Sequence, residues 1–351
     1  MSRSDKSRMV LMPGARPVPM IKELEKQFVD FWIRLRCNLY DKERRGKLSH
    51  SELSRAKWLA EKALERRKCE AGLGSLSRKE LPALLALIKD GGQLSGPSTE
   101  DEVHRLVADL HAESPWMRDV STWIMTQMLG HVASGGYGVA LPPMILSGPP
   151  GIGKSHFART LANLARVPVR MIDVGGGSAG FRIAGTEKGW GSAQPGIPVE
   201  TLLAKRIANP IMIVDEIDKA GTIHSQTGTA SSLTTSLLQM LEPGTARHFE
   251  CPYYRVPFDM SRVIWIMTAN EIECVPAPLR DRSRVFILSK LSAEDAVTYF
   301  ARLTRDCDRD DDWHRCCAFI ARMSERPDGI SLRQIQQLGA ALTTPMQKAM
   351  H

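Results

Sequence analysis

Residues 148–155 carry the spacing of a loop that binds the phosphates of a nucleotide. They read Gly-Pro-Pro-Gly-Ile-Gly-Lys-Ser and match the pattern G-x-x-x-x-G-K-[ST] at every fixed position. A phosphate chain needs several backbone N–H groups directed inward, and glycines permit the tight loop that directs them. Lys154 is then expected to reach the β- and γ-phosphates, and the Ser155 hydroxyl to coordinate magnesium. The spacing therefore predicts a site for ATP and Mg²⁺.

The flanks of this loop favour the same interpretation over a chance glycine-rich turn. Residues 142–146 form a short apolar run typical of a buried strand, and apolar residues at helical spacing follow from Phe157 to Leu164. A strand, a glycine loop and a helix are the context that the motif requires, with the positive end of the helix facing the anion. The predicted nucleotide-binding residues are Gly148, Pro149, Pro150, Gly151, Ile152, Gly153, Lys154, Ser155 and His156.

A second chemical motif follows about sixty residues later. The apolar run 211–214 ends in two adjacent acids, Asp215 and Glu216. Ligands of open α/β sheets bind at the carboxyl ends of the strands, and adjacent residues at a strand end point in different directions. Asp215 is therefore expected to hold the magnesium shell, and Glu216 to polarise the attacking water as a general base. Asn270, after the apolar run 263–268, either orients that water or caps a turn.

The elements that must position these residues alternate between strand and helix. Strands are expected at 169–174, 211–214, 263–268 and 284–288, and helices at 199–208 and 230–241, with a long glycine-rich loop at 175–196. This alternation predicts an α/β fold with a doubly wound parallel sheet. Helices are also expected at 21–40, 52–68, 81–88, 100–111, 116–131, 292–304, 313–324 and 331–343.

The net charge of +8 lies wholly in the first part of the chain. Residues 1–100 hold 21 Lys and Arg against 13 Asp and Glu, and residues 101–351 hold 26 of each. This bias favours an anionic partner for residues 1–100, either nucleic acid or an acidic protein surface, with a solvated helical face as the alternative. Residues 1–20, with three prolines and a basic cluster, are expected to form a disordered arm.

The composition also limits the compartment and the redox chemistry. The chain has no apolar run of the ~18 residues that a membrane span needs and no signal core behind its basic start, so we expect a cytoplasmic protein without a membrane partner. The seven cysteines form no C-x-x-C pair, which argues against a disulfide framework or a zinc site.

Several further stretches resemble the AAA+ module of Lon proteases over roughly residues 140–345. The resemblance rests on the phosphate loop, Asp-Glu-Ile-Asp-Lys at 215–219, Val-Pro-Phe-Asp at 256–259, Thr-Ala-Asn at 268–270, and Val-Pro-Ala-Pro-Leu at 275–279 followed by Asp281 and Arg282. It implies strand order 5-1-4-3-2, a helical lid, and a homo-oligomeric ring, usually hexameric, with ATP sites between subunits. The expected domains are a basic helical N-terminal region at 21–97, the ATPase core at 98–289 and the lid at 290–351.

The resemblance also implies roles for single residues. Lys154 and Ser155 are similar to the Walker A pair, Asp215 and Glu216 to the Walker B pair, and Asn270 to sensor 1. Arg282 stands where the family has an arginine finger that acts on the neighbouring subunit, although the family's Asp-Arg-Met-Glu is Asp-Arg-Ser-Arg in this chain. Arg333, in the stretch 329–333, is similar to sensor 2, with a surface arginine as the alternative.

Trp190, in the glycine-rich stretch 189–196, resembles the aromatic residue of a pore loop that grips polypeptide; a packing tryptophan is the alternative. The family's peptidase domain would follow His351, and no nucleophile constellation is visible. We therefore expect an ATPase that remodels or threads protein without peptidase activity of its own, alone or for a separate protease. The alternatives are a motor or loader that acts on nucleic acid through residues 1–100, and a nucleotide switch or scaffold.

Overall fold

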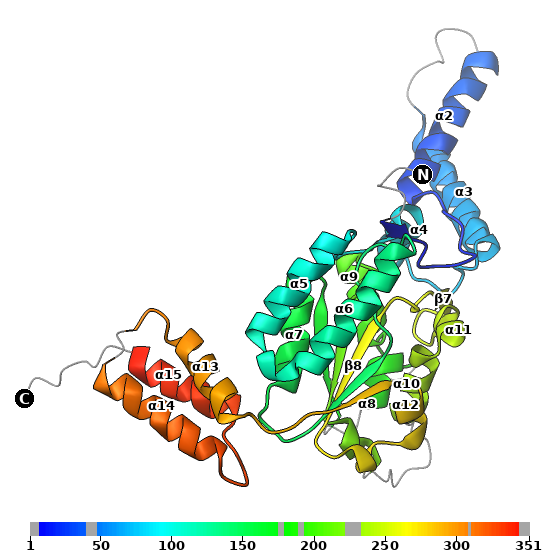
Figure 1. Cartoon of the computed structure of the whole chain (residues 1–351). Coiled ribbons are helices and arrows are strands. Elements are labelled where there is room, and N and C mark those ends of the chain that lie inside the picture. Colours follow the sequence, from blue (N-terminus) through cyan, green and yellow to red (C-terminus); the bar gives the residue numbers. More distant parts are fainter. Residues whose placement is uncertain are drawn as a thin grey trace, which may run out of the picture.

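A parallel sheet forms the centre of the molecule, and helical subdomains lie at its two ends (Figure 1). The computed structural model describes residues 7–39, 48–174, 179–188, 193–221, 233–307 and 310–343. Helices α2 (Ile21–Leu39) and α3 (His50–Glu70) extend from one end. Helices α13 (Ala293–Leu303), α14 (Asp311–Ser324) and α15 (Leu332–Thr343) lie at the other.

The central sheet has five parallel strands in the spatial order β4-β5-β8-β3-β9. Counted along the chain as strands one to five, this order reads 5-1-4-3-2 from the β9 edge, which confirms the expected α/β fold. The phosphate loop follows β3, between β8 and β9, so it leaves the sheet beside two carboxyl-terminal strand ends. The strands are β3 (Met144–Ser147), β4 (Val169–Asp173), β5 (Ile211–Asp215), β8 (Ile264–Ala269) and β9 (Arg284–Ile287).

Alternating strand residues bury two separate faces of this sheet. In β5, Ile211 and Ile213 join one apolar cluster, and Met212 and Val214 join the other, as the two-residue period of a strand requires. Helices α5 (Glu100–Glu113), α6 (Arg118–Ala133) and α7 (Lys154–Leu164) cover the first face. Helices α8 (Ala179–Ala184), α9 (Ile197–Lys205) and α10 (Leu233–Leu241) contribute to the second.

The N-terminal region shares the second cluster with the sheet. Strand β1 (Arg8–Met9) pairs antiparallel with β2 (Gly92–Gln93), and Leu11 and Met12 are buried. The described part of residues 1–20 therefore differs from the expected disordered arm, because the apolar side chains just before Pro13 pack against distant segments. Helix α4 (Leu81–Asp90) buries Leu84 and Leu87 in the same cluster. The boundary near residue 97 stays a prediction.

The three C-terminal helices have an apolar cluster of their own. Phe300, Trp313, Ile320 and Ile335 are buried in it. The indole N–H of Trp313 donates to Thr304 Oγ1 at 2.8 Å, which satisfies a buried polar group inside the cluster. These helices correspond to the predicted helical lid, and their separate core makes them a distinct packing unit.

The glycine-rich and connecting segments contain short elements that periodicity did not predict. Helix α8 lies within the expected loop 175–196, and strands β6 (Phe249–Cys251) and β7 (Val256–Phe258) form a hairpin. No helix in the described part of the chain combines the length and apolar character that crossing a bilayer requires. The other short elements are η2 (Pro115–Met117), η3 (Ile217–Gly221), α11 (Pro243–Ala246), η4 (Ile272–Cys274) and α12 (Ala277–Asp281).

Candidate nucleotide-binding site

The phosphate loop adopts the backbone that its glycines were expected to allow. Gly151 and Gly153 have φ angles of 80° and 93°, a region that other residues rarely adopt. Helix α7 begins at Lys154, directly after Gly153, so its unpaired N–H groups point toward the loop. A side chain at either glycine would collide with Ser331 or Leu332 of the C-terminal subdomain. The dihedral angles therefore favour glycine at both positions, and close packing against Ser331 adds to this at Gly151.

The C-terminal subdomain forms one wall of a cleft above this loop. The backbone N–H of Leu332 donates to the Gly151 carbonyl at 2.8 Å. The cleft has a volume of about 670 Å³, within the range of small-molecule sites. Its walls come from the phosphate loop, the first turn of α7, the ends of β5 and β8, and the start of α15, which includes Arg333 and Gln336. Arg333 therefore lines the same cleft as the phosphate loop, and its role as sensor 2 stays a prediction.

Lys154 is buried at the base of the cleft with each of its protons directed to an acceptor. Its Nζ donates to the Gly148 carbonyl at 2.5 Å, the Pro149 carbonyl at 3.0 Å and Asn270 Oδ1 at 3.0 Å. Burial lowers the pKa of the Lys154 ammonium, while the charges of nearby carboxylates, first that of Asp215, act in the opposite direction. The structure therefore places Asn270 next to the lysine.

Asp215 and Ser155 converge where magnesium was predicted. The Ser155 hydroxyl donates to Asp215 Oδ1 at 2.7 Å, and the buried Thr268 hydroxyl donates to the same oxygen at 2.5 Å. Magnesium prefers oxygen ligands and is commonly held by one or two protein groups together with phosphates and water. Ser155 and Asp215 fit that donor set, and Thr268 orients the carboxylate. The sequence motif did not identify Thr268, which belongs to the neighbouring strand β8.

Glu216 lies in the same cleft on a backbone turn of unusual conformation. Its φ is 58°, and its backbone N–H donates to Thr268 Oγ1 at 3.2 Å. The carboxylate is hydrogen-bonded to the Lys219 ammonium, and this bond raises the pKa of Lys219. Asp215 and Glu216 both line the cleft. Asp218 accepts the Asn270 backbone N–H at 3.2 Å and so fixes the end of β8.

Among the predicted site residues that the structure describes, Arg282 does not line this cleft, and neither do Gly148, Pro149 and Ile152 of the phosphate loop. Arg282 lies at the end of α12, where its exposed guanidinium is 3.7 Å from Glu242 Oε2 and donates to the Pro278 carbonyl at 3.4 Å. It therefore contributes nothing to the cleft of its own chain, and its role toward another subunit stays a prediction. Trp190 lies outside the described residues.

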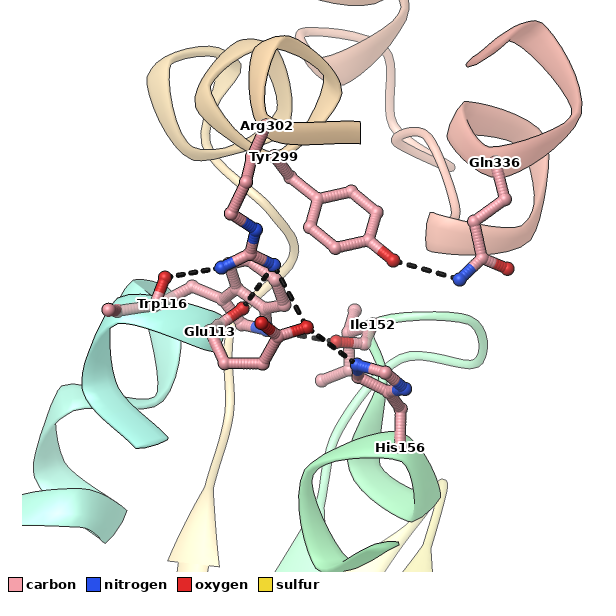
Figure 2. Close-up of polar contacts among 8 residues, drawn as sticks. Glu113, Trp116, Ile152, His156, Tyr299, Arg302 and Gln336 are labelled. Carbon is pink, nitrogen blue, oxygen red and sulfur yellow. Dashed lines mark hydrogen bonds and ion pairs between the residues drawn. The ribbon is translucent and has the colours of Figure 1, made fainter. Parts of the chain in front are cut away.

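A polar network joins the C-terminal subdomain to the core beside the phosphate loop (Figure 2). Arg302 of α13 lies 3.1 Å from Glu113 Oε1 and donates to the backbone carbonyls of Ala112 and Glu113. The same Glu113 oxygen lies 3.3 Å from Nε2 of His156, the residue that follows Ser155. His156, predicted as a nucleotide-binding residue, thus lines the cleft and also contacts this network.

Trp116 extends the network from the loop to α15. Its indole N–H donates to the Ile152 carbonyl at 2.9 Å, and its ring packs edge-on against Tyr299 with centroids 5.6 Å apart. The Tyr299 hydroxyl accepts a hydrogen bond from Gln336 at 2.8 Å (Figure 2). No local motif marks Glu113, Trp116 or Arg302, since their partners are distant in the chain.

Comparisons with known proteins agree with this geometry. Residues 144–291 match the family described as "ATPase family associated with various cellular activities (AAA)". The chain is 38% identical over 154 residues to a mitochondrial Lon protease homolog of Phaeodactylum tricornutum, a match that covers 44% of this chain and 17% of that protein. It is 28% identical over 242 residues to Lon protease 4 of Sorangium cellulosum, covering 69% and 29%. The chain thus spans less than a third of these relatives.

Solved structures of Hsp104 share the fold. A closed-state reconstruction of Hsp104 with ATPγS and FITC casein superimposes with a TM-score of 0.52 at 17% identity, covering 91% of this chain and 57% of that one. The extended Hsp104–casein complex of S. cerevisiae gives a TM-score of 0.50, also at 17% identity, covering 81% and 55%. At this identity the likeness concerns the fold alone.

Proposed function

We propose that the chain hydrolyses ATP to remodel or thread polypeptides, because residues 144–291 match the AAA family and part of the chain is similar to Lon proteases. The observation that carries the proposal is the convergence of Ser155 Oγ and Asp215 Oδ1, 2.7 Å apart, beside Lys154 and Glu216 in one cleft. Few other chemistries require a glycine loop at a helix start, a buried lysine and two strand-end acids together.

Each group in the cleft has a distinct role in this proposal. The loop N–H groups and Lys154 bind the phosphates, and Arg333 contacts them from the subdomain wall. Ser155 and Asp215 would hold Mg²⁺, and the ion would neutralise charge on the phosphates when bound. Glu216 accepts a proton from the attacking water once its carboxylate leaves Lys219, and Asn270 orients that water.

We further propose that Arg282 completes the site of a neighbouring copy in a homo-oligomeric ring, which the family resemblance makes hexameric. Arg282 is exposed, and its own cleft does not include it. A guanidinium supplied by another subunit would stabilise charge on the transferred phosphoryl group. Turnover would therefore depend on assembly, and a polypeptide would be gripped by Trp190 in the ring. A separate protease partner is compatible with this activity.

Mixing two inactive variants tests the composite site. Glu216→Gln and Arg282→Ala should each lower phosphate release by about 10²-fold or more. An equimolar mixture should regain turnover, because an Arg282→Ala subunit can receive the intact arginine of a Glu216→Gln neighbour. Glu250→Gln, which changes an exposed glutamate of β6, is the matched control and should retain the wild-type rate. A monomeric chain at full speed without Arg282 would refute the proposal.

A second candidate function is an ATP-driven motor on nucleic acid. Helix α3 favours it, because the exposed side chains of Arg55, Lys57 and Arg67 add to the positive charge of residues 1–100. Binding of single- or double-stranded DNA that weakens steeply with salt, and stimulation of turnover by that DNA, would support this function. Stimulation by unfolded protein but not by DNA would support the first.

A further inference from the structure

Lys188 is the last described residue before the segment 189–192, and it lies at a junction of three parts of the chain. Its Nζ donates to Glu80 Oε2 at 2.8 Å and to the Ser75 carbonyl at 3.3 Å. Both partners belong to the N-terminal region, more than a hundred residues away in the sequence. The Lys188 side chain is 31% exposed and that of Glu80 14%, so the ion pair is largely shielded from solvent.

The turn of the β6–β7 hairpin forms the third side of this junction. The Lys188 ammonium lies 5.0 Å from the ring centroid of Tyr253 and 6.0 Å from that of Tyr254, within the range of cation–π attraction. The Ser75 hydroxyl donates to the Tyr254 carbonyl at 2.7 Å. The N-terminal region therefore contacts the hairpin directly as well as through Lys188. In Figure 1, α4 and β7 lie at the same end of the sheet.

The N-terminal side of the junction is held by buried apolar residues. Leu73, Leu76 and Leu81 surround Ser75 and Glu80 in sequence and are buried in the cluster shared with the sheet. Burial disfavours the Glu80 carboxylate, but hydrogen bonds from Lys188 and Ser77 outweigh it and lower the pKa of Glu80 to about 2. The partner of Lys188 is thus a fixed, charged group.

The other side of the junction is the base of the stretch that contains Trp190. Gly185 and Pro195 form an antiparallel bridge. The Thr186 N–H donates to the Gln194 carbonyl at 3.0 Å, and the Gln194 N–H donates to Thr186 Oγ1 at 3.0 Å. Residues 185–186 and 194–195 therefore pair as a closed stem, and Lys188 leaves that stem two residues before Trp190.

We propose that Lys188 is a positioning residue through which the N-terminal region sets the location of this stem and so controls the response to an extended polypeptide. The inference rests on the proposed function, since it takes the segment after Lys188 as the one that contacts polypeptide. In this proposal Glu80 and Ser75 of the N-terminal region fix one side of the stem through Lys188, a role separate from the region's net positive charge. A change at Glu80 should therefore alter polypeptide-stimulated turnover while leaving the nucleotide cleft intact.

The test compares basal and stimulated phosphate release of the full-length chain, with reduced, carboxymethylated α-lactalbumin as the unfolded polypeptide. Lys188→Met, which keeps most of the aliphatic side chain but removes the charge, should lose about fivefold or more of the stimulation at an unchanged basal rate. Glu80→Gln should show a smaller loss of the same kind. Lys188→Arg, which retains the charge and the cation–π contact, should restore the wild-type response.

Asp90→Asn is the matched control. Asp90 also joins the N-terminal region to the core, through Arg206 at 3.7 Å, but away from the stem, so this variant should behave as wild type. Hydrogen exchange at the amides of Thr186 and Gln194 gives a second readout and should rise in Lys188→Met alone among these variants. Unchanged exchange together with an unchanged stimulated rate would overturn the inference.

The two proposals fail in different ways. A wild-type chain that turns over ATP without any response to the polypeptide would overturn the proposed polypeptide function. A responsive wild-type chain whose Lys188→Met variant responds equally would overturn only the role of Lys188. An equal loss of stimulation in Asp90→Asn would show that any disturbance of the N-terminal contact has this effect, which also refutes a specific role for Lys188.

Discussion

The N-terminal region and the C-terminal subdomain both pack against the α/β core, but with different chemistry. The N-terminal region contributes Leu11, Leu73 and Leu84 to the same apolar cluster as the sheet. The C-terminal subdomain has its own cluster and meets the core through hydrogen bonds, the Arg302–Glu113 ion pair and the edge-on packing of Trp116 against Tyr299. Apolar burial is costly to reverse, whereas polar contacts can be exchanged for water at small net cost. We therefore expect the contact between the C-terminal subdomain and the core to be the easier of the two to open.

The largest effect is expected from Phe300→Ala in the C-terminal cluster. Phe300 is fully buried, and its truncation should destabilise α13–α15 by about 3–5 kcal/mol. Because that cluster is separate, the amides of α13–α15 should lose hydrogen-exchange protection while those of β8 keep theirs. Phe319→Ala is the control, because Phe319 lies in the same subdomain but is 41% exposed, so its truncation should have little effect on exchange protection. Equal loss of protection in β8 would show that the subdomain and the core unfold together.

Leu84→Ala should instead destabilise the N-terminal region and the central sheet together. Leu84 is fully buried in the cluster that the N-terminal region shares with the sheet, so truncation should lower the free energy of unfolding by about 2–5 kcal/mol. Chemical denaturation followed at Trp265, buried in β8, should report this loss in one transition. Leu53→Ala, at an exposed position of α3, should have little effect. An unchanged Trp265 transition would contradict the shared core.

Arg302→Met should weaken the contact between the subdomain and the core without unfolding either. The guanidinium binds the carboxylate and two carbonyls at the end of α5, and such charged hydrogen bonds contribute about 1.5–3 kcal/mol. Fluorescence energy transfer between labels on α14 and α6 should show a broader distance distribution. Arg315→Met breaks only an ion pair within α14 and is the control. An unchanged distance distribution in Arg302→Met would contradict this prediction and would mean that the contacts of Trp116 and Leu332 hold the subdomain against the core without Arg302.

The smallest effect is a pH dependence of the N-terminal contact. The pKa of Glu80 is about 2 in the folded chain against an ordinary 4.5, so its ionised form adds stability above pH 4.5. That contribution is lost as the pH falls from 4.5 toward 2. The free energy of unfolding of wild type should therefore decline more steeply over this interval than that of Glu80→Gln. Parallel curves for the two proteins would contradict the strength of the Lys188–Glu80 pair.

The sequence predicted the parts of this structure that have local causes. The strand before Gly148 and the strand that ends at Asp215 were visible as short apolar runs, and the helices as periodic patterns. Helix α8 was missed because six residues between glycines are too few to show a period, and the β6–β7 strands have three residues each. The order of residues 7–20 was not predicted, because the burial of Leu11 depends on partners far along the chain that local sequence does not reveal.

The same division holds for the candidate site. Lys154, Ser155, Asp215 and Asn270 belong to motifs whose spacing reflects one local geometry, and the structure brings them together. Glu113 and Arg302 meet across almost two hundred residues, and Lys188 meets Glu80 across more than a hundred. Pairs of this kind are set by topology, and a single sequence does not show which charged residues will meet.

Lys154 carries a consequence for ligand discrimination. With each ammonium proton already matched to an oxygen, an incoming phosphate oxygen must replace Gly148, Pro149 or Asn270 as the acceptor. The net binding free energy from Lys154 is therefore the difference between its hydrogen bonds to the phosphate and the hydrogen bonds to the protein that they replace. A phosphate that displaces Asn270 from Lys154 would leave the Asn270 side-chain amide able to turn toward the phosphate. The conformation at the end of β8 would then depend on whether the terminal phosphate is present.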